Sequence, residues 1–288
     1  MNDRNGHCFP RLLKRHRRVP LSLILRFLVG ASAALTVSVL LVLIGYIMIN
    51  GVPNLSAQLF AVEYTTQNVS LLPALVNTVL ITFLSLLIAV PIGVFSAIYL
   101  VEYAKKGNKL VAIVRLTAET LSGIPSIVYG LFGLLFFVTK LGWGYSVLAG
   151  SFTLAIMVLP VVFQTAEESL KAVPNTYREA SFGLGAGKLR TVFRIVLPSA
   201  VPGILSGIIL SVGRIVGESA ALIYTAGTVA EISNGLFSSG RTLAVHMYAL
   251  TSEGLYVKQA YATAVVLLVM VMGMNALSAY AAKKVSKG

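Results

Sequence analysis

The chain has 288 residues, of which 57% are hydrophobic and only 11% are charged, and Cys8 is its one cysteine. An ordinary soluble domain carries about a quarter charged residues, so this composition excludes that class. A single cysteine excludes a disulfide framework and a cysteine-rich metal site. The net charge of +13 could suit a nucleic-acid-binding protein, but the placement of the basic residues around long apolar segments argues against it.

Apolar segments of membrane-spanning length follow one another along most of the chain. We expect an all-α, polytopic membrane protein with six transmembrane helices, at about 24–49, 73–101, 117–139, 145–167, 199–226 and 259–282. The first segment has a basic start and a small-residue Ala31-Ser32-Ala33 sequence, as a signal peptide would. Its apolar run continues through Ile49, so we interpret it as an uncleaved helix. The expected parts are a basic tail at 1–23, a membrane domain at 24–282 and a second tail at 283–288.

Basic residues predict the orientation of these helices. Only Lys140, Arg241 and Lys258 fall on one side of the predicted membrane, and Arg214 falls within it. The other 19 of the 23 basic residues fall on the opposite side: Arg4, Arg11, Lys14, Arg15, Arg17, Arg18, Arg26, Lys105, Lys106, Lys109, Arg115, Lys171, Arg178, Lys188, Arg190, Arg194, Lys283, Lys284 and Lys287. By the positive-inside rule, both termini and the loops 102–115 and 168–198 are expected in the cytoplasm.

Proline and glycine interrupt several of the apolar segments. Three breaks are visible, at 91–93, 123–125 and 159–160, and such breaks are tolerated where neighbouring helices or a cavity satisfy the freed backbone groups. The fifth segment carries two pairs of glycines four residues apart, Gly203 with Gly207 and Gly213 with Gly217. Small residues at this spacing predict close helix packing.

The run 183–188, Gly-Leu-Gly-Ala-Gly-Lys, looks like a phosphate-binding loop but lacks its essential residues. A Walker loop has glycine five residues before its Gly-Lys pair, where this chain has Phe182. It also has serine or threonine after the lysine, where this chain has Leu189. We therefore expect no ATP, magnesium or other cofactor to bind to this chain.

A second motif overlaps this run. Its residues are Glu179, Ala180, Ser181, Gly185, Ile195, Leu197 and Pro198. Their spacing resembles the cytoplasmic EAA motif of ABC importer permeases, which reads Glu-Ala-Ala, three residues, Gly, nine residues, Ile-x-Leu-Pro, and Ser181 is the one departure. The resemblance implies that 168–198 is a coupling loop, with a short helix–turn–helix that docks into a cytoplasmic ATPase. The alternative is a basic loop that lies on anionic lipid.

Two further stretches, 121–133 and 213–227, resemble phosphate-importer permeases. The resemblance covers about residues 70–285. Compact length, short outer loops and the sequences at 242–246 and 252–254 are similar to the PstA-type subunit rather than to its PstC-type partner.

Arg214, Glu218 and Ser219 are the candidate substrate-pathway residues. Arg214 and Glu218 lie in an otherwise apolar segment, where a charge costs about 2.5–3.5 kcal/mol and needs a partner, water or a function. Their i,i+4 spacing places them within reach on one helical face. A station for an oxyanion is the favoured interpretation, because arginine presents a fork of donors. A structural ion pair is the alternative.

Other titratable residues carry less information. His246 is a lone histidine in a polar outer segment, and we interpret it as a surface or interface residue. Glu167 and Glu168 are adjacent, so they point to different sides of a helix and suit an interface rather than a catalytic pair. No metal-spaced cluster appears in the sequence, which gives a membrane enzyme little support.

The resemblance implies a non-catalytic permease subunit in the bacterial inner membrane, which forms half of the pathway of an ATP-driven phosphate importer. The implied partners are a PstC-type permease subunit, two ATPase subunits that carry ATP and magnesium, an extracytoplasmic phosphate-binding protein and membrane lipid, but no nucleic acid. An importer of another oxyanion, such as molybdate or sulfate, is one alternative. A mainly signalling subunit that reports phosphate status is the other.

Overall fold

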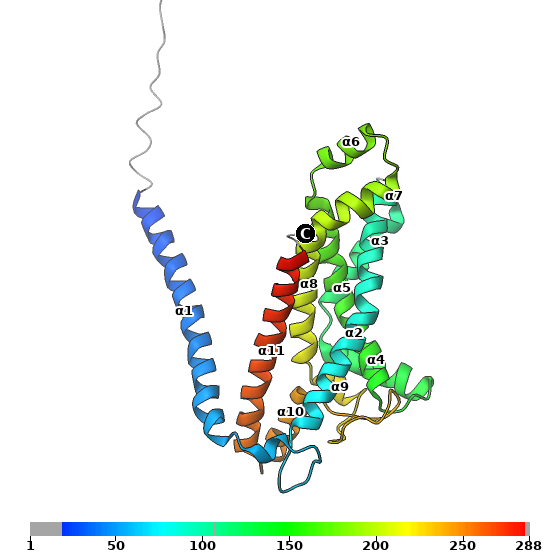
Figure 1. The fold of residues 1–288 in the computed structure, drawn as a ribbon. Helices are drawn as coiled ribbons and strands as arrows, with labels where there is room; N and C mark the ends of the chain where they lie inside the picture. Colours follow the sequence, from blue (N-terminus) through cyan, green and yellow to red (C-terminus); the bar gives the residue numbers. More distant parts are fainter. Residues whose placement is uncertain (1–18, 106, 286–288) are drawn as a thin grey trace, which may run out of the picture. The chain divides into compact units, whose positions relative to one another are not determined.

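The computed structural model describes residues 19–105 and 107–285. Within them all regular structure is helical (Figure 1). In chain order the elements are α1 (Val19–Gly51), the 3-10 turns η1 (Val52–Asn54) and η2 (Ala57–Phe60), α2 (Leu72–Ile98) with its π-helical extension η3 (Tyr99–Tyr103), α3 (Lys109–Ser122), α4 (Ser126–Gly133) with η4 (Leu134–Lys140), α5 (Val147–Ala172), α6 (Asn175–Gly183), α7 (Lys188–Thr191) with η5 (Val192–Val196), α8 (Leu197–Val216), α9 (Ala220–Ile223), α10 (Leu243–Glu253) and α11 (Val257–Val285).

The chain divides into two units, residues 1–49 and 50–288. The first unit contains most of α1, a single apolar helix with one charged residue, Arg26, among those described. Its length and composition agree with the first expected span. Most of the expected basic tail, with Cys8, lies outside the described residues, as do Lys106 and residues 286–288.

The core of the second unit is built by α2, α5 and α8. Glycines let these helices approach closely: a Cβ added to Gly93 of α2 would lie 2.9 Å from Val162 Cγ1 of α5. On α8, a Cβ at Gly203 or Gly207 would collide with Ser169 or Thr165 of α5. The packing expected of the first glycine pair is therefore confirmed. For the second pair, no neighbouring helix of the described residues lies within 4 Å of a Cβ at either position, so this part of the chain forms no such packing there.

The proline breaks have different outcomes. Helices α2 and α5 continue through Pro91 and Pro160, whereas Pro125 separates α3 from α4, and the two meet at a bend of 103°. Because Pro125 has no N–H, the helix closes just before it, with the Ile124 N–H donating to Leu121 O at 3.1 Å. The break expected at 123–125 is therefore confirmed, and it divides the span expected over 117–139 into two helices.

The third span also begins earlier than expected. Asn108 caps α3, since its side-chain oxygen accepts a hydrogen bond from the Leu110 N–H at 2.9 Å, and the helix begins at Lys109. Five helical segments are long and apolar enough to cross a membrane, and the bent pair α3–α4 makes a sixth if it counts as one broken span. The all-α, multi-pass architecture is confirmed.

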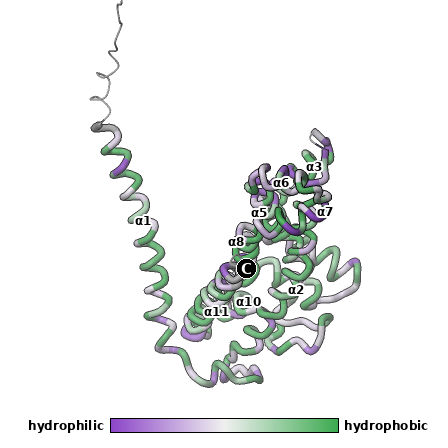
Figure 2. Tube along the Cα trace, turned by 45° about the horizontal axis from the view of Figure 1, so that its top comes forward, coloured by the Kyte–Doolittle hydropathy of each residue, from purple (hydrophilic) through white to green (hydrophobic). Residues whose placement is uncertain are grey.

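Different helices lie at the two ends of the second unit, and hydropathy varies along it. In Figure 1, α6 and α7 lie at one end, and α9 and α10 lie toward the other. Figure 2 shows hydrophilic segments around α6 and α7 and long hydrophobic stretches along α2, α8 and α11. The segment expected to form a loop at 168–198 thus forms a polar tip on an apolar bundle.

Candidate functional site

The chain leaves its helix immediately after Arg214. Helix α8 ends at Val216, with the Gly217 N–H donating to Gly213 O at 3.2 Å. The Glu218 N–H donates to Ile215 O, three residues earlier, also at 3.2 Å. The last turn is therefore tighter than an α-helical turn, and the helix ends there. The fifth expected span, 199–226, is therefore wrong beyond Val216. It is also longer at its start, because the helical path begins at Lys188.

This break separates Arg214 from Glu218. The Glu218 carboxylate accepts a hydrogen bond from the Ala221 N–H at 3.1 Å, at the start of α9. No carboxylate of the described residues lies within 4 Å of the Arg214 guanidinium. The expected i,i+4 pairing on one helical face is wrong, because the two residues do not share a helix. Arg214 is half-buried at the last turn of α8 and has no hydrogen-bond partner among the described residues.

Helix α4 forms the neighbouring wall of this site. A Cβ at Gly130 would lie 2.8 Å from the Ala221 Cα, so α4 and α9 are in backbone contact. One turn from the start of α4, the buried Tyr129 donates its hydroxyl proton to Leu121 O at 2.7 Å. Tyr129 also packs in one apolar cluster with Ile215 and Ala221, which lie on the two sides of the break. The α3–α4 bend and the α8–α9 break are thus parts of one site.

Ser219 begins α9 but does not cap it. Its carbonyl oxygen accepts from the Ile223 N–H at 3.0 Å, and its side chain makes no capping hydrogen bond. The serine is half-buried. The three residues predicted for a substrate pathway therefore lie together at the break, with Tyr129 as a member that the sequence did not indicate.

The EAA-like residues form a helical hairpin. We call residues 175–191, comprising α6, α7 and the turn between them, the coupling hairpin. Gly185 occupies this turn with φ +80°, a conformation that glycine adopts freely. Its N–H donates to Phe182 O at 2.9 Å, and the Ala186 N–H donates to Ser181 O at 3.1 Å. The helix–turn–helix expected from the resemblance is present.

Apolar side chains are exposed on this hairpin. Leu184, at the turn, is 90% exposed, and Leu189 and Tyr177 are 66% and 51% exposed. Of the motif residues, Glu179, Ala180, Gly185 and Pro198 are exposed and Ile195 and Leu197 are half-buried. Exposed large apolar side chains of this kind occur at surfaces that bind another protein or a membrane.

Ser181 is the one buried member of the motif. Its hydroxyl forms a hydrogen bond of 2.8 Å with the Thr191 hydroxyl, and Thr191 Oγ1 also donates to Gly187 O at 3.2 Å. The departure from the usual alanine thus has a structural role, because it links α6 to α7 across the turn.

Two ionic clusters lie near the hairpin. The Glu167 carboxylate is bound by Arg115 Nε of α3 at 2.6 Å and by Lys171 Nζ at 2.9 Å. Glu167 is buried whereas Glu168 is exposed, so they do point to different sides. The interpretation of Glu167 as an interface residue is wrong, because it packs inside the chain. The second cluster joins Arg178 to Glu102, two residues whose roles the sequence did not indicate.

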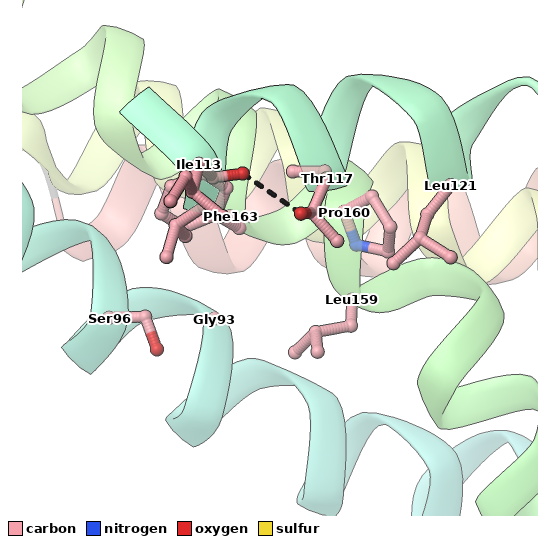
Figure 3. A pocket seen from close by; sticks show the side chains of 10 residues that line it. Gly93, Ser96, Ile113, Thr117, Leu121, Leu159, Pro160 and Phe163 are labelled. Atoms are coloured by element: carbon pink, nitrogen blue, oxygen red, sulfur yellow. Dashed lines mark hydrogen bonds between the residues drawn. The ribbon is translucent and has the colours of Figure 1, made fainter. Parts of the chain in front are cut away.

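An apolar cavity of about 230 Å³ lies between α2, α3 and α5 (Figure 3). Its walls include Gly93, Thr117, Leu121, Pro160 and Phe163. The Thr117 hydroxyl is already used, since it donates to Ile113 O at 2.8 Å. A cavity with such walls offers no charge-assisted donor to an anion, so it is not a second oxyanion site.

His246 is fully buried in α10, so its interpretation as a surface or interface residue is wrong. Its ring meets the Tyr64 ring edge-on, with centroids 6.2 Å apart, and Arg241 lies over the same Tyr64 ring at 4.6 Å. Burial and, to a smaller extent, the charge of Arg241 lower the pKa of His246 to about 3. No group of three metal-binding side chains lies together in the described part of the chain.

Known proteins have sequences similar to this one. Residues 89–287 match the family described as "Binding-protein-dependent transport system inner membrane component". The probable ABC transporter permease protein YqgI of Bacillus subtilis is 36% identical over 78% of this chain and 82% of its own length. The phosphate transport system permease protein PstA of Mycobacterium leprae is 34% identical over 72% of this chain and 68% of its own. PstA 1 of Mycobacterium tuberculosis is 40% identical, but the match spans only 53% of that protein.

A solved structure shares the fold. The crystal structure of a bacterial ABC transporter that imports the acidic polysaccharide alginate superposes with a TM-score of 0.62 at 16% identity, covering 93% of this chain and 99% of that one. Such low identity indicates the fold alone. The family match covers more than half of the sequence, and the relatives agree with it. The chain therefore belongs to the family of inner-membrane components of binding-protein-dependent transport systems.

Proposed function

We propose that this chain is a transmembrane permease subunit of an ATP-driven phosphate importer and contributes half of the translocation pathway. The observation that carries the proposal is the Arg214 guanidinium, which stands at the end of α8 without a carboxylate partner among the described residues. A cation at membrane depth requires compensation, and a passing oxyanion supplies it. The PstA proteins among the relatives indicate phosphate as that oxyanion.

The geometry of the break suits transient binding. Arg214 offers charge-assisted hydrogen bonds to a phosphate oxygen. Glu218 does not neutralise Arg214, because its carboxylate caps the Ala221 N–H. Its negative charge close to the path disfavours long residence of an anion. A translocation path must release its ion as well as bind it. Arg214 favours binding of the phosphate, and the nearby negative charge of Glu218 favours its release.

The coupling hairpin is the proposed contact with a cytoplasmic ATPase. Its exposed Leu184 and Leu189 supply apolar surface for docking, and the polar residues around them keep the tip outside the lipid. Glu179, Ala180, Ser181 and Gly185 build the hairpin. Ile195, Leu197 and Pro198 lead from it into α8, so a displacement of the hairpin reaches the helix that carries Arg214.

The complete importer would contain this chain, a PstC-type permease, two ATPase subunits and an extracytoplasmic phosphate-binding protein. ATP and magnesium would bind to the ATPase subunits, and this chain would be non-catalytic. Closure of the ATPase pair would move the hairpin and open the path toward the binding protein. Hydrolysis would then reset the path. In this arrangement the termini and the hairpin lie in the cytoplasm.

Phosphate uptake by an Arg214→Gln variant tests the proposal. Uptake should fall at least about tenfold, because hydrogen bonds to charged groups contribute about 1.5–3 kcal/mol. The complex should still assemble, since Arg214 has no ion-pair partner here to leave unpaired. Lys258→Gln removes an exposed positive charge elsewhere and should leave uptake unchanged.

Other outcomes separate the alternatives. Normal uptake by Arg214→Gln, together with lost regulation by phosphate, would favour a signalling subunit. Uptake of molybdate or sulfate in preference to phosphate by the unchanged complex would favour an importer of another oxyanion. The double change Arg214→Gln with Glu218→Gln should transport no better than Arg214→Gln alone. Recovery in the double variant would instead indicate that the two charges compensate each other.

A further inference from the structure

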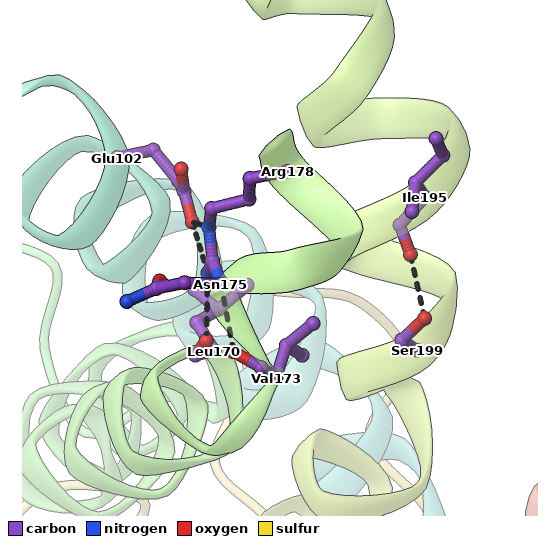
Figure 4. A network of polar contacts seen from close by, with 7 residues as sticks. All are labelled: Glu102, Leu170, Val173, Asn175, Arg178, Ile195 and Ser199. Atoms are coloured by element: carbon purple, nitrogen blue, oxygen red, sulfur yellow. Dashed lines mark hydrogen bonds and ion pairs between the residues drawn. The ribbon is translucent and has the colours of Figure 1, made fainter. Parts of the chain in front are cut away.

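We infer that Arg178 is a positioning residue that joins the coupling hairpin to α2 and α5, so that movement of the hairpin is passed to these membrane helices. The inference rests on the proposed ATPase contact of the hairpin. Arg178 lies in α6, Glu102 lies in the extension η3 of α2, and Leu170 lies in the last turn of α5. Figure 4 shows these three residues meeting at one point.

Hydrogen bonds from the Arg178 guanidinium reach all three elements. Its Nε and Nη2 donate to Glu102 Oε1 at 3.1 Å and 2.6 Å. Nη2 also donates to Leu170 O at 3.0 Å, and Nη1 donates to Val173 O at 2.8 Å. A weaker contact of 3.4 Å runs from Nη1 to Asn175 Oδ1. One planar fork therefore holds a carboxylate and two main-chain carbonyls at once, a geometry that lysine does not reproduce.

We call the contacts of Arg178 with Glu102, Leu170 and Val173 the joint. Its two charged side chains are buried. The side chains of Arg178 and Glu102 are only 14% and 8% exposed. Loss of one member of a buried pair leaves the other charge without compensation, which is strongly destabilising for that arrangement. Leu170 lies in the last turn of α5 and Val173 directly follows its end, so the hydrogen bonds from Arg178 to these two carbonyls also satisfy the α5 terminus.

Without this joint the hairpin would be attached to α5 by a short link alone. Helix α5 ends at Ala172 and α6 begins at Asn175, so only Val173 and Pro174 connect them. Val173 is extended, with φ −67° and ψ 124°, and such a link can act as a hinge. Arg178 bridges the hinge from α6 to both α2 and α5. Inside the hairpin, the Ser181–Thr191 hydrogen bond keeps α6 and α7 together.

The test uses the complete importer in proteoliposomes, with phosphate uptake and ATP hydrolysis measured on the same sample. Glu102→Gln leaves the carbonyl contacts of Arg178 in place and weakens only the link to α2. Arg178→Lys keeps the charge but loses the fork. In both variants, phosphate transported per ATP hydrolysed should fall at least about fivefold, which is the lower range of coupling between sites in proteins. Lys105→Gln, an exposed charge removed close by, should keep the native ratio.

Normalising uptake to hydrolysis by assembled complex separates positioning from simple loss of stability. A merely structural role would lower the amount of complex but leave the ratio unchanged. Arg178→Gln should show the largest fall in the ratio; if that variant does not assemble, Arg178→Lys and Glu102→Gln decide. A native ratio in these two assembled variants overturns the inference.

A crosslink distinguishes failure of the joint from failure of the ATPase contact. A cysteine at position 184, in a Cys8→Ser background, should crosslink to the ATPase because Leu184 is exposed at the tip of the hairpin. No crosslink would remove the proposed contact and the inference with it. A crosslink together with a native ratio in Arg178→Lys and Glu102→Gln would overturn the joint alone.

Discussion

A tyrosine hydroxyl compensates for the hydrogen bond that Pro125 removes. In an uninterrupted helix the residue at 125 would donate its N–H to Leu121 O, and proline has none. The Tyr129 hydroxyl donates to this carbonyl at 2.7 Å, next to Ile124 N–H at 3.1 Å. The sequence shows the proline and the tyrosine four residues apart, but it does not show that a side chain from the next helix turns back. The Leu121 carbonyl therefore keeps its hydrogen bonds at this sharp bend, as an interrupted apolar helix requires.

His246 predicts a pH dependence of stability. Its pKa is about 3 in the folded chain and about 6.5 when unfolded, so the unfolded state binds the extra proton as the pH falls below 6.5. At pH 5 this costs the folded state about 2 kcal/mol relative to pH 7.5. Neither ring nitrogen has a hydrogen-bond partner among residues 19–105 and 107–285, so His246→Phe removes no hydrogen bond within this part of the chain.

Thermal unfolding of the detergent-solubilised complex between pH 7.5 and pH 5 measures this effect. The native complex should lose more stability over this range than the His246→Phe complex. Parallel losses in the two complexes would show that His246 is protonated in the folded state.

At the scale of elements, the turn of the coupling hairpin depends on one glycine. Gly185 has φ +80° and open space where a Cβ would stand, so a side chain there meets no atoms and costs only backbone strain. That strain is about 1–2 kcal/mol, and it is larger for a β-branched residue. Gly185→Val should therefore distort the turn, lower co-purification of the ATPase and reduce uptake, while the protein still inserts.

Gly107 provides the matched control for this change. It has φ +83° and equally open space, but it lies in the turn before α3, outside the hairpin. Gly107→Val introduces the same kind of strain without altering the proposed ATPase contact. Equal uptake by the two variants would argue against a special role for the hairpin turn.

The sequence predicted which helices are present better than it predicted the residues at which they end. Long uncharged windows predicted α1, α2, α5 and α11, since an apolar stretch of about 20 residues has few alternatives to a membrane helix. The end of α8 at Val216 could not be predicted, because the apolar pattern continues past Gly217. The spacing of Arg214 and Glu218 therefore indicated a shared face that the chain does not form. Two residues spaced i,i+4 face each other only if the helix continues through both of them.

At the scale of the whole molecule, the charge distribution predicts which end of the second unit faces the cytoplasm. Lys188 lies in the coupling hairpin and Lys258 at the start of α11, and both are exposed. In a Cys8→Ser background, an impermeant thiol reagent applied to intact cells should label a cysteine at 258 and not one at 188. Labelling at 188 but not at 258 would reverse the orientation, and with it the side proposed for the ATPase.

Much of the candidate site could be predicted from the sequence, because its charged residues lie within otherwise apolar segments. Arg214 and Glu218 stand out for that reason, and the EAA-like spacing identified the hairpin. Arg178 and Glu102 were not identified, because each lies among other polar residues and their contact spans 76 positions. Sequence spacing alone gives no signal for such a pair.

The Ser181–Thr191 hydrogen bond has a consequence for how this family varies. Both hydroxyls are buried, but only Ser181 depends on the other, because Thr191 also donates to Gly187 O. A change at position 191 should therefore constrain position 181 during evolution. Relatives with serine at 181 should carry a hydroxyl at 191, whereas relatives with the usual alanine at 181 should accept either threonine or an apolar residue at 191. An alignment that shows independent variation would contradict this linkage.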